Sequence, residues 1–151
     1  MCFMNNVKRW VTCLSLLVCA YAQDVFISFG NVTNTSAEVN YSSNIDIGGF
    51  QFTFTGGGLS NVSGGESDNL TMVSFNPEGG GVIGFDMTGY SIAPGSGLLA
   101  NLEFSSEPGA TLCLEELVIS SAGGTTADSE FGGCVTLSMP EITISLGSVD
   151  L

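Results

Sequence analysis

Almost all of the side chains that could catalyse a reaction in this chain are carboxylates. Asp and Glu together number 15, Lys8 and Arg9 are the two basic residues, and the sequence has no histidine. Acid–base chemistry would therefore need a pair of carboxylates, as in glycoside hydrolysis. The adjacent residues Glu115 and Glu116 would point to opposite faces of a strand, and no serine lies in a nucleophile elbow. We expect no catalytic residues and no enzyme activity.

Cysteine chemistry is limited to one pair. Three of the five cysteines fall in the first 22 residues, which leaves Cys113 and Cys134. The apolar residues that flank them alternate so that both cysteines take the outward face of their strands. An even pair in an oxidising compartment predicts a disulfide between these two residues. The alternative, a reactive or metal-binding thiol pair, has no histidine and no second cysteine pair to complete it.

Five Asn-x-Ser/Thr sequons crowd the first half of the chain that follows residue 22. Their asparagines are Asn31, Asn34, Asn40, Asn61 and Asn69. They fall in turns, at strand ends or at an outward position, which suits surface acceptors of N-glycans. We expect glycosylation at two or more of them. The alternative is that the producing cell leaves them as ordinary turn asparagines.

Two acidic loops, residues 66–69 and 128–130, could bind Ca²⁺, which prefers carboxylate and carbonyl oxygens. Neither loop has the spacing of a known calcium motif. We therefore expect solvated loop charge, with no metal site and no cofactor.

The first 22 residues have the features of a signal peptide. Lys8 and Arg9 precede a short apolar run over residues 10–19, and Ala20-Tyr21-Ala22 fits the small-x-small cleavage rule. We expect a secreted protein without a membrane span, because the apolar run is too short to cross a bilayer. The mature chain of 129 residues (151 − 22) would keep all 15 carboxylates and no basic side chain. Such a surface repels nucleic acid, and complementary charges cannot join its subunits.

Short apolar–polar alternations between glycine-rich turns predict an all-β chain. Residues 59–69 and 122–133 are polar and predict loops, and Ile83, Phe85 and Met87 form the apolar row of one strand. Because each strand has one apolar face, we expect a two-sheet jelly-roll sandwich of eight to nine strands. The expected strands cover residues 25–29, 37–41, 50–54, 70–75, 83–87, 98–104, 111–120, 134–138 and 142–149.

The order of several short motifs resembles that of cohesin-type domains, which are secreted jelly-roll sandwiches related to carbohydrate-binding modules. The motifs are ISFGNV (27–32), IGGFQF (47–52), VIGFDMTG (82–89), IAPGSGLL (92–99) and LEF (102–104), followed by the cysteine pair. The resemblance covers roughly residues 25–135. It implies a sandwich with a protein-binding or scaffold role and no catalysis, but it defines no dockerin-binding face in this sequence.

The last residues repeat the pattern of the first expected strand. Aligning residues 141–149 with residues 24–32 gives four identities: Ile, Ser, Gly and Val. We therefore divide the chain into a signal peptide (1–22), a sandwich (23–138), and a linker with a possible donor strand (139–151). A spare strand could add to the sheet of another copy and so build an extracellular filament head to tail. The expected subunit interface is Ile142, Ile144, Leu146 and Val149.

Two hypotheses about partners follow. In the first, the partners are copies of the same chain, which carries glycans. In the second, residues 142–149 are the last strand of their own sandwich. The protein is then a monomeric cohesin- or carbohydrate-module-like binding domain at the cell surface.

Overall fold

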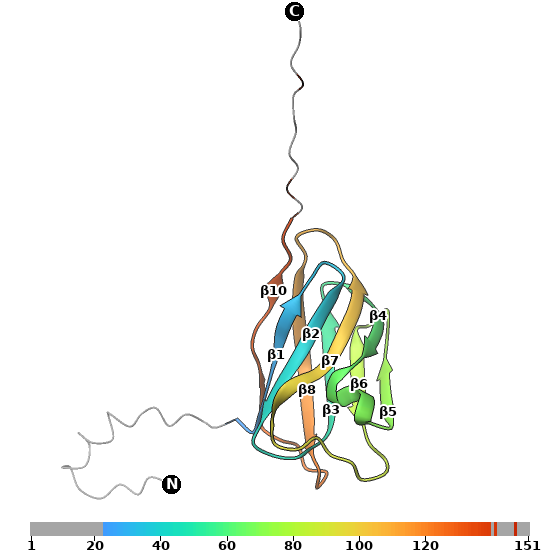
Figure 1. Ribbon diagram of the computed structural model, residues 1–151, viewed down its shortest axis with the longest axis vertical. Helices are drawn as coiled ribbons and strands as arrows, with labels where there is room; N and C mark the ends of the chain where they lie inside the picture. Colours follow the sequence, from blue (N-terminus) through green and yellow to red (C-terminus); the bar gives the residue numbers. More distant parts are fainter. Residues whose placement is uncertain (1–22, 140, 142–146, 148–151) are drawn as a thin grey trace, which may run out of the picture.

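The computed structural model describes residues 23–139, 141 and 147, and these form an all-β sandwich (Figure 1). One short 3-10 turn, η2 (Gly65–Asn69), interrupts the strands. Among the described residues, no helix has the length and hydropathy needed to cross a membrane. The strands are β1 (Val25–Val32), β2 (Ser36–Ser43), β3 (Ile47–Thr55), β4 (Gly58–Ser63), β5 (Met72–Phe75), β6 (Gly81–Phe85), β7 (Gly95–Ser105), β8 (Thr111–Ser121), β9 (Ser129–Phe131) and β10 (Val135–Thr136).

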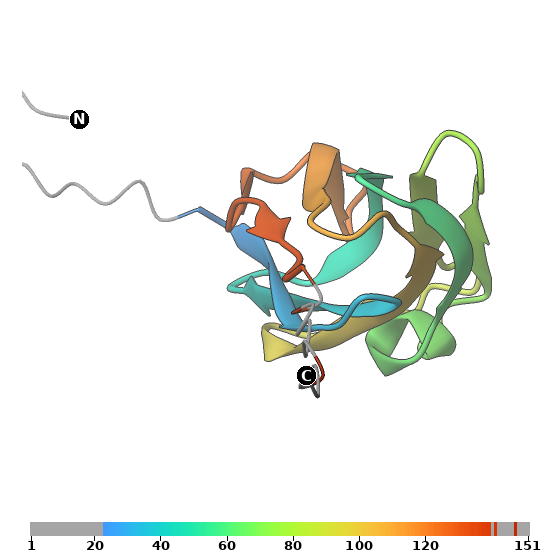
Figure 2. The same cartoon turned by 90° about the horizontal axis from the view of Figure 1, so that it is seen from above.

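The strands form two five-stranded sheets that face each other, as the view from above shows (Figure 2). Sheet A has the order β4-β7-β2-β1-β9, and sheet B has the order β10-β8-β3-β6-β5. Neighbouring strands are antiparallel except β1 and β9, which are parallel over three residues. This arrangement confirms the predicted two-sheet sandwich.

Aromatic side chains of β3 form the centre of the core between the sheets. Phe50, Phe52 and Phe54 are each 2% exposed or less, and the rings of Phe54 and Phe104 lie 5.0 Å apart. Burial of one such side chain contributes about 1.5–3 kcal/mol to folding. The alternation predicted for residues 50–54 is therefore confirmed.

The apolar row predicted for the fifth expected strand does not face the core. Ile83 is 40% exposed and Met87, which follows β6, is 71% exposed. Val82 and Gly84 take the inward positions instead. A Cβ at Gly84 would lie 2.5 Å from Cζ of Phe50, so this position must lack a side chain. The apolar alternation predicted the wrong inward face for this strand, because one of its inward residues is a glycine.

Two predicted loops contain strands. The first part of the predicted loop 59–69 belongs to β4 (Gly58–Ser63), which pairs with β7 and buries Leu59. Residues 129–131 form β9, which pairs with Val25–Ile27 of β1. Tertiary pairing overrides weak local propensity in both, because polar and glycine residues can occupy edge strands whose backbone finds a partner.

A β-bulge in β8 corrects the expected orientation of its two glutamates. The register with β3 shifts between Gln51 and Thr53, and Glu116 adopts a positive φ of 53°. Both Glu115 and Glu116 are consequently exposed, rather than lying on opposite faces. The Glu116 carboxylate accepts a hydrogen bond of 2.8 Å from the Thr53 hydroxyl.

The disulfide joins β8 to the segment that leads into β10. The Sγ atoms of Cys113 and Cys134 lie 2.05 Å apart, with 21 residues of sequence separation. The neighbouring Leu112, Leu114 and Leu137 are buried, as the predicted alternation requires. The bond holds the start of the short strand β10, which has only two residues in the ladder with β8.

We expect the double variant Cys113→Ser/Cys134→Ser to lose about 3 kcal/mol of stability, because the unfolded chain is no longer restricted by a closed loop of this length. In a domain of this size, that loss lowers Tm by roughly 10 °C. Thermal unfolding followed by circular dichroism without reductant, with the wild-type protein as reference, measures the effect. An unchanged Tm would contradict a stabilising role for the bond.

Candidate functional site

The described carboxylates form no metal centre. No group of three or more His, Cys, Asp or Glu residues in the described chain could hold a metal ion. In the first predicted acidic loop, the Glu66 carboxylate accepts hydrogen bonds from the Asn69 amide (3.1 Å) and the Tyr90 hydroxyl (2.9 Å). The Asp68 carboxylate accepts one from the backbone of Gly64 (2.7 Å). These carboxylates fix the loop around η2.

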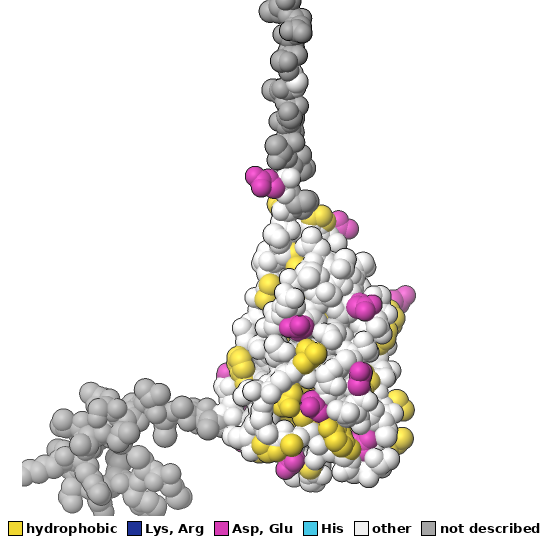
Figure 3. Space-filling view, viewed as in Figure 1, with side chains coloured by type: hydrophobic (Ala, Val, Ile, Leu, Met, Phe, Trp, Pro, Cys, Tyr) yellow, Lys and Arg dark blue, Asp and Glu magenta, His cyan; other side chains and the backbone are white. Residues whose placement is uncertain are grey.

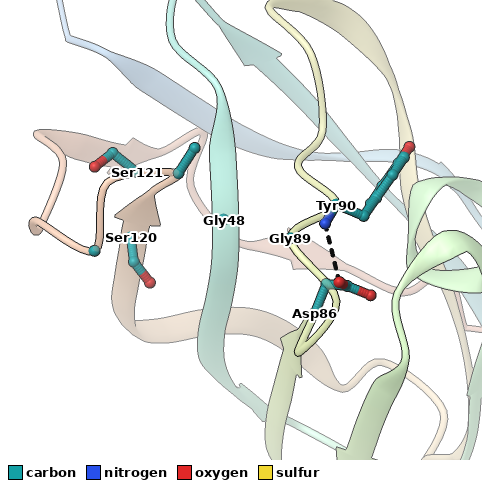
Figure 4. A pocket seen from close by; sticks show the side chains of 8 residues that line it. Gly48, Asp86, Gly89, Tyr90, Ser120 and Ser121 are labelled. Carbon is teal, nitrogen blue, oxygen red and sulfur yellow. Dashed lines mark hydrogen bonds between the residues drawn. The ribbon is translucent and has the colours of Figure 1, made fainter.

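Asp86 organises the loop between β6 and β7, beside a shallow pocket of about 230 Å³ (Figure 4). Its carboxylate accepts hydrogen bonds from the backbone N–H groups of Thr71 (3.1 Å), Thr88 (2.6 Å) and Tyr90 (2.9 Å). The Thr88 hydroxyl donates a fourth bond of 2.7 Å. The Thr88 hydroxyl, followed by the backbone donors, lowers the pKa of Asp86 well below its ordinary value. This carboxylate therefore stabilises the loop and offers no acid or base near neutral pH.

We expect Asp86→Asn to lower Tm near neutral pH, because an amide cannot accept all four bonds. The pKa of Asp86 is lower in the folded chain than in the unfolded one. Its stabilising effect is therefore complete above the unfolded value of about 4 and is lost as the pH falls through the folded value. The Tm difference from wild type should shrink below about pH 4. Glu78→Gln, at an exposed turn, is the control, and a pH-independent difference would contradict the assignment.

The outer face of sheet B carries an apolar patch. Met72, Ile83 and Val118 are 40%, 40% and 46% exposed, and half-buried Phe85 lies beside them. Ile83 and Val118 flank Gln51 in the register of β6, β3 and β8. A hollow of about 240 Å³ lies between these strands. We call Met72, Ile83, Phe85 and Val118 the apolar patch.

Four of the sequons lie on sheet A or its β1–β2 turn, and the fifth, Asn69, lies in the connection from β4 of sheet A to β5 of sheet B. Asn31 in β1, Asn34 in the β1–β2 turn and Asn69 in η2 are exposed, and Asn40 in β2 and Asn61 in β4 are half-buried. Asn40 lies over Gly30, where a Cβ would come within 2.4 Å of its Nδ2. Figure 3 shows carboxylates scattered over the described surface, with no Lys, Arg or His among them.

A cleft of about 400 Å³ separates the end of β1 from β10. Val32, Thr33 and Asn34 form one wall, and residues 135–138 form the other. Leu137 donates its N–H to Ala110 (2.8 Å), which ties the second wall to sheet B. The cleft therefore lies where the two sheets come together at one edge of the sandwich, and Figure 1 shows β1 and β10 along that edge. We call it the β1–β10 cleft.

The backbone of β1 is open toward this cleft. Val25 N–H bonds to Asp128 (3.0 Å), and the carbonyl of Ile27 accepts from Gly132 (2.8 Å), so alternate residues of β1 face the β9 side. Phe29, two residues after Ile27, directs its backbone N–H and C=O groups toward the same side. Within the described part of the chain, no strand pairs with this side of β1 beyond Ile27. Phe29 and Val32 are half-buried and pack on the core, so the side chains along the open edge that face the core are apolar.

The predicted subunit interface, Ile142, Ile144, Leu146 and Val149, lies outside the described residues. The chain leads toward it from Ser138, which lines the β1–β10 cleft. No local sequence pattern indicates either the cleft or the apolar patch. The first depends on where the segment after β9 crosses from sheet A to sheet B, and the second on the inverted phase of β6.

No protein-family model and no curated protein sequence matches this chain. Several solved structures match, among them two that are covered over most of their length. A non-cellulosomal cohesin from the hyperthermophilic archaeon Archaeoglobus fulgidus has a TM-score of 0.59 and 14% identity, over 78% of this chain and 92% of the other. A chain of a type I cohesin–dockerin complex from Clostridium thermocellum has a TM-score of 0.56 and 13% identity, over 80% of this chain and 96% of the matched chain.

The chain has the cohesin fold. The expected resemblance to cohesin-type domains is thereby confirmed at the level of the fold. At identities this low, the cohesin-like sandwich carries no functional residue over from either structure.

Proposed function

We propose that the protein is a secreted, glycosylated and non-catalytic structural subunit that joins to other copies of itself by strand addition. Residues 142–149 of one copy would add to the open edge of β1 in the next. The observation that carries the proposal is this edge, where no described strand pairs with the β9 side of β1 beyond Ile27 and a cleft lies beside the end of β1 at Val32. Strand addition uses main-chain hydrogen bonds for affinity and side-chain pockets for register.

The incoming segment matches the edge in chemistry and size. Residues 142–149 alternate apolar and polar side chains as β1 does, and eight extended residues span about 26 Å. Ile144 and Leu146 would cover the apolar walls that Val32 and Val135 form. Because residues 23–151 contain no basic side chain, ion pairs between side chains cannot supply this contact. Backbone pairing and apolar burial remain.

Pro140 favours addition to a neighbour over return to the same sandwich. Proline restricts the residue before it to extended conformations, which disfavours a tight reversal of the chain at Met139. The chain leaves at Ser138, at the same end of the sandwich as the β1–β10 cleft. An open filament therefore requires each subunit to donate to one neighbour and accept from another. Reciprocal exchange between two copies would instead close the assembly.

We expect deletion of residues 141–151 to leave a folded monomer that no longer assembles. Ile144→Asp should raise the concentration needed for assembly about tenfold or more, because it places a charge in an apolar contact. Ser145→Asp is the matched control, since it adds the same charge on the opposite side of the strand. Light scattering and sedimentation as a function of concentration measure the assembly.

Three results would contradict the filament. An unfolded truncation would show that the last strand belongs to its own sandwich. A mature protein that stays monomeric after its glycans are removed would exclude self-assembly, and a discrete dimer would show reciprocal exchange instead of polymerisation.

A second candidate function rests on the apolar patch of sheet B. The Clostridium thermocellum structure is a complex of a cohesin with a dockerin, so this fold serves protein binding there. Here the patch is exposed, lies on a sheet without sequons, and surrounds a hollow. In this alternative the protein is a monomeric module that binds another protein at the cell surface through sheet B.

We expect the pair Ile83→Asp/Val118→Asp to abolish binding of the labelled protein to the cells that secrete it if the patch is the binding surface. Exposed substitutions of this kind change stability little, so Tm should stay near the wild-type value. Ser60→Asp/Ser96→Asp, at two exposed positions of sheet A outside the sequons, adds the same charge as a control. Equal binding of both pairs, measured by flow cytometry, would reject the patch as the binding surface.

A further inference from the structure

One of the five sequons, Asn34, lies at the β1–β10 cleft, and a second, Asn31, lies nearby in β1. Asn34 lines the cleft directly, and Asn31 belongs to the part of β1 beyond its pairing with β9. The other three asparagines lie elsewhere. Asn40 is on β2 over Gly30, Asn61 is on β4 at the opposite edge of sheet A, and Asn69 ends η2.

The turn that carries Asn34 is held firmly in place. The Thr33 hydroxyl accepts hydrogen bonds from the backbone N–H groups of Thr35 (3.3 Å) and Ser36 (2.9 Å). The carbonyl of Asn34 accepts a bond of 3.2 Å from the Ser106 hydroxyl, which ties the turn to the β7–β8 connection. A glycan on Asn34 would consequently start from a fixed point on the cleft wall.

We propose that an N-glycan on Asn34 closes the β1–β10 cleft to an incoming strand, so that occupancy of this one sequon sets whether a subunit can accept a neighbour. The inference rests on the strand addition proposed above. Asn34 is exposed, so its amide is open to modification, and an N-glycan is bulky and hydrated. An incoming strand must displace water and approach the backbone of Phe29 to hydrogen-bond distance. A glycan rooted on the wall of a 400 Å³ cleft opposes both requirements.

The glycan acts on the acceptor and leaves the donor unaffected. Residues 142–149 contain no sequon, so a subunit glycosylated on Asn34 can still donate its own strand. Such a subunit would end a growing chain, because the next copy finds no open edge. The ratio of modified to unmodified subunits would thus set filament length.

The test compares three mature proteins secreted from a glycosylating host: wild type, Asn34→Gln and Asn69→Gln. Mass spectrometry should show one glycan fewer in each variant than in wild type. We expect Asn34→Gln to assemble at a concentration about tenfold or more below wild type, and Asn69→Gln to match wild type. Equal Tm values for the three proteins would show that the variants affect the cleft and not the fold.

Enzymatic removal of all glycans separates the two proposals. If the deglycosylated wild type assembles but Asn34→Gln behaves as the glycosylated wild type, the gate at Asn34 is wrong and strand addition stands. Absence of a glycan on Asn34 in the wild-type protein would also overturn the gate. If none of the proteins assembles, even after deglycosylation, strand addition fails and the gate fails with it.

Discussion

The phenylalanine side chains of β3 fill the space between the two sheets, and their packing determines which side chains reach the surface. The ring of Phe50 occupies the volume that a side chain at Gly84 would need. Of the two buried residues of β6, Val82 and Gly84, only Val82 therefore carries a side chain. Ile83 and Phe85 lie on the outer face. The exposed apolar patch of sheet B is thus a direct result of how the core is filled.

A second consequence of the topology is the open edge of β1. The segment after β8 contributes three residues to sheet A as β9 and two residues to sheet B as β10. Because this short segment crosses from sheet A to sheet B, β9 pairs with only the first part of β1, Val25–Ile27. Many proteins protect such edges with lysine. This chain has no lysine after residue 8, so edge protection must come from carboxylates, bulges or glycans.

Sequence reasoning predicted the sandwich, the β3 core row and the cysteine pair, because period-two alternation is strong where large apolar residues face inward. It failed for strands in which glycine or polar residues make the backbone pairing with a neighbouring strand. Leu59 is the one fully buried residue of β4, and β9 has no apolar alternation to recognise. The bulge at Glu116 was equally hidden, since a positive φ at a non-glycine residue has no signature in one sequence. The cleft and the patch arise from strand order and phase, which local patterns do not encode.

The absence of basic side chains after Arg9 has a consequence for how proteases can cut the chain. Trypsin-like proteases cut after lysine or arginine, because an acidic specificity pocket must bind a cationic side chain. Residues 23–139 offer them no such bond in any conformation, folded or unfolded. Resistance to trypsin-like proteases therefore follows from the composition and does not depend on the stability of the sandwich. Enzymes that recognise apolar or acidic side chains could still cut the chain, and Met87 and Met139, at 71% and 75% exposed, are its most exposed large apolar side chains among the described residues.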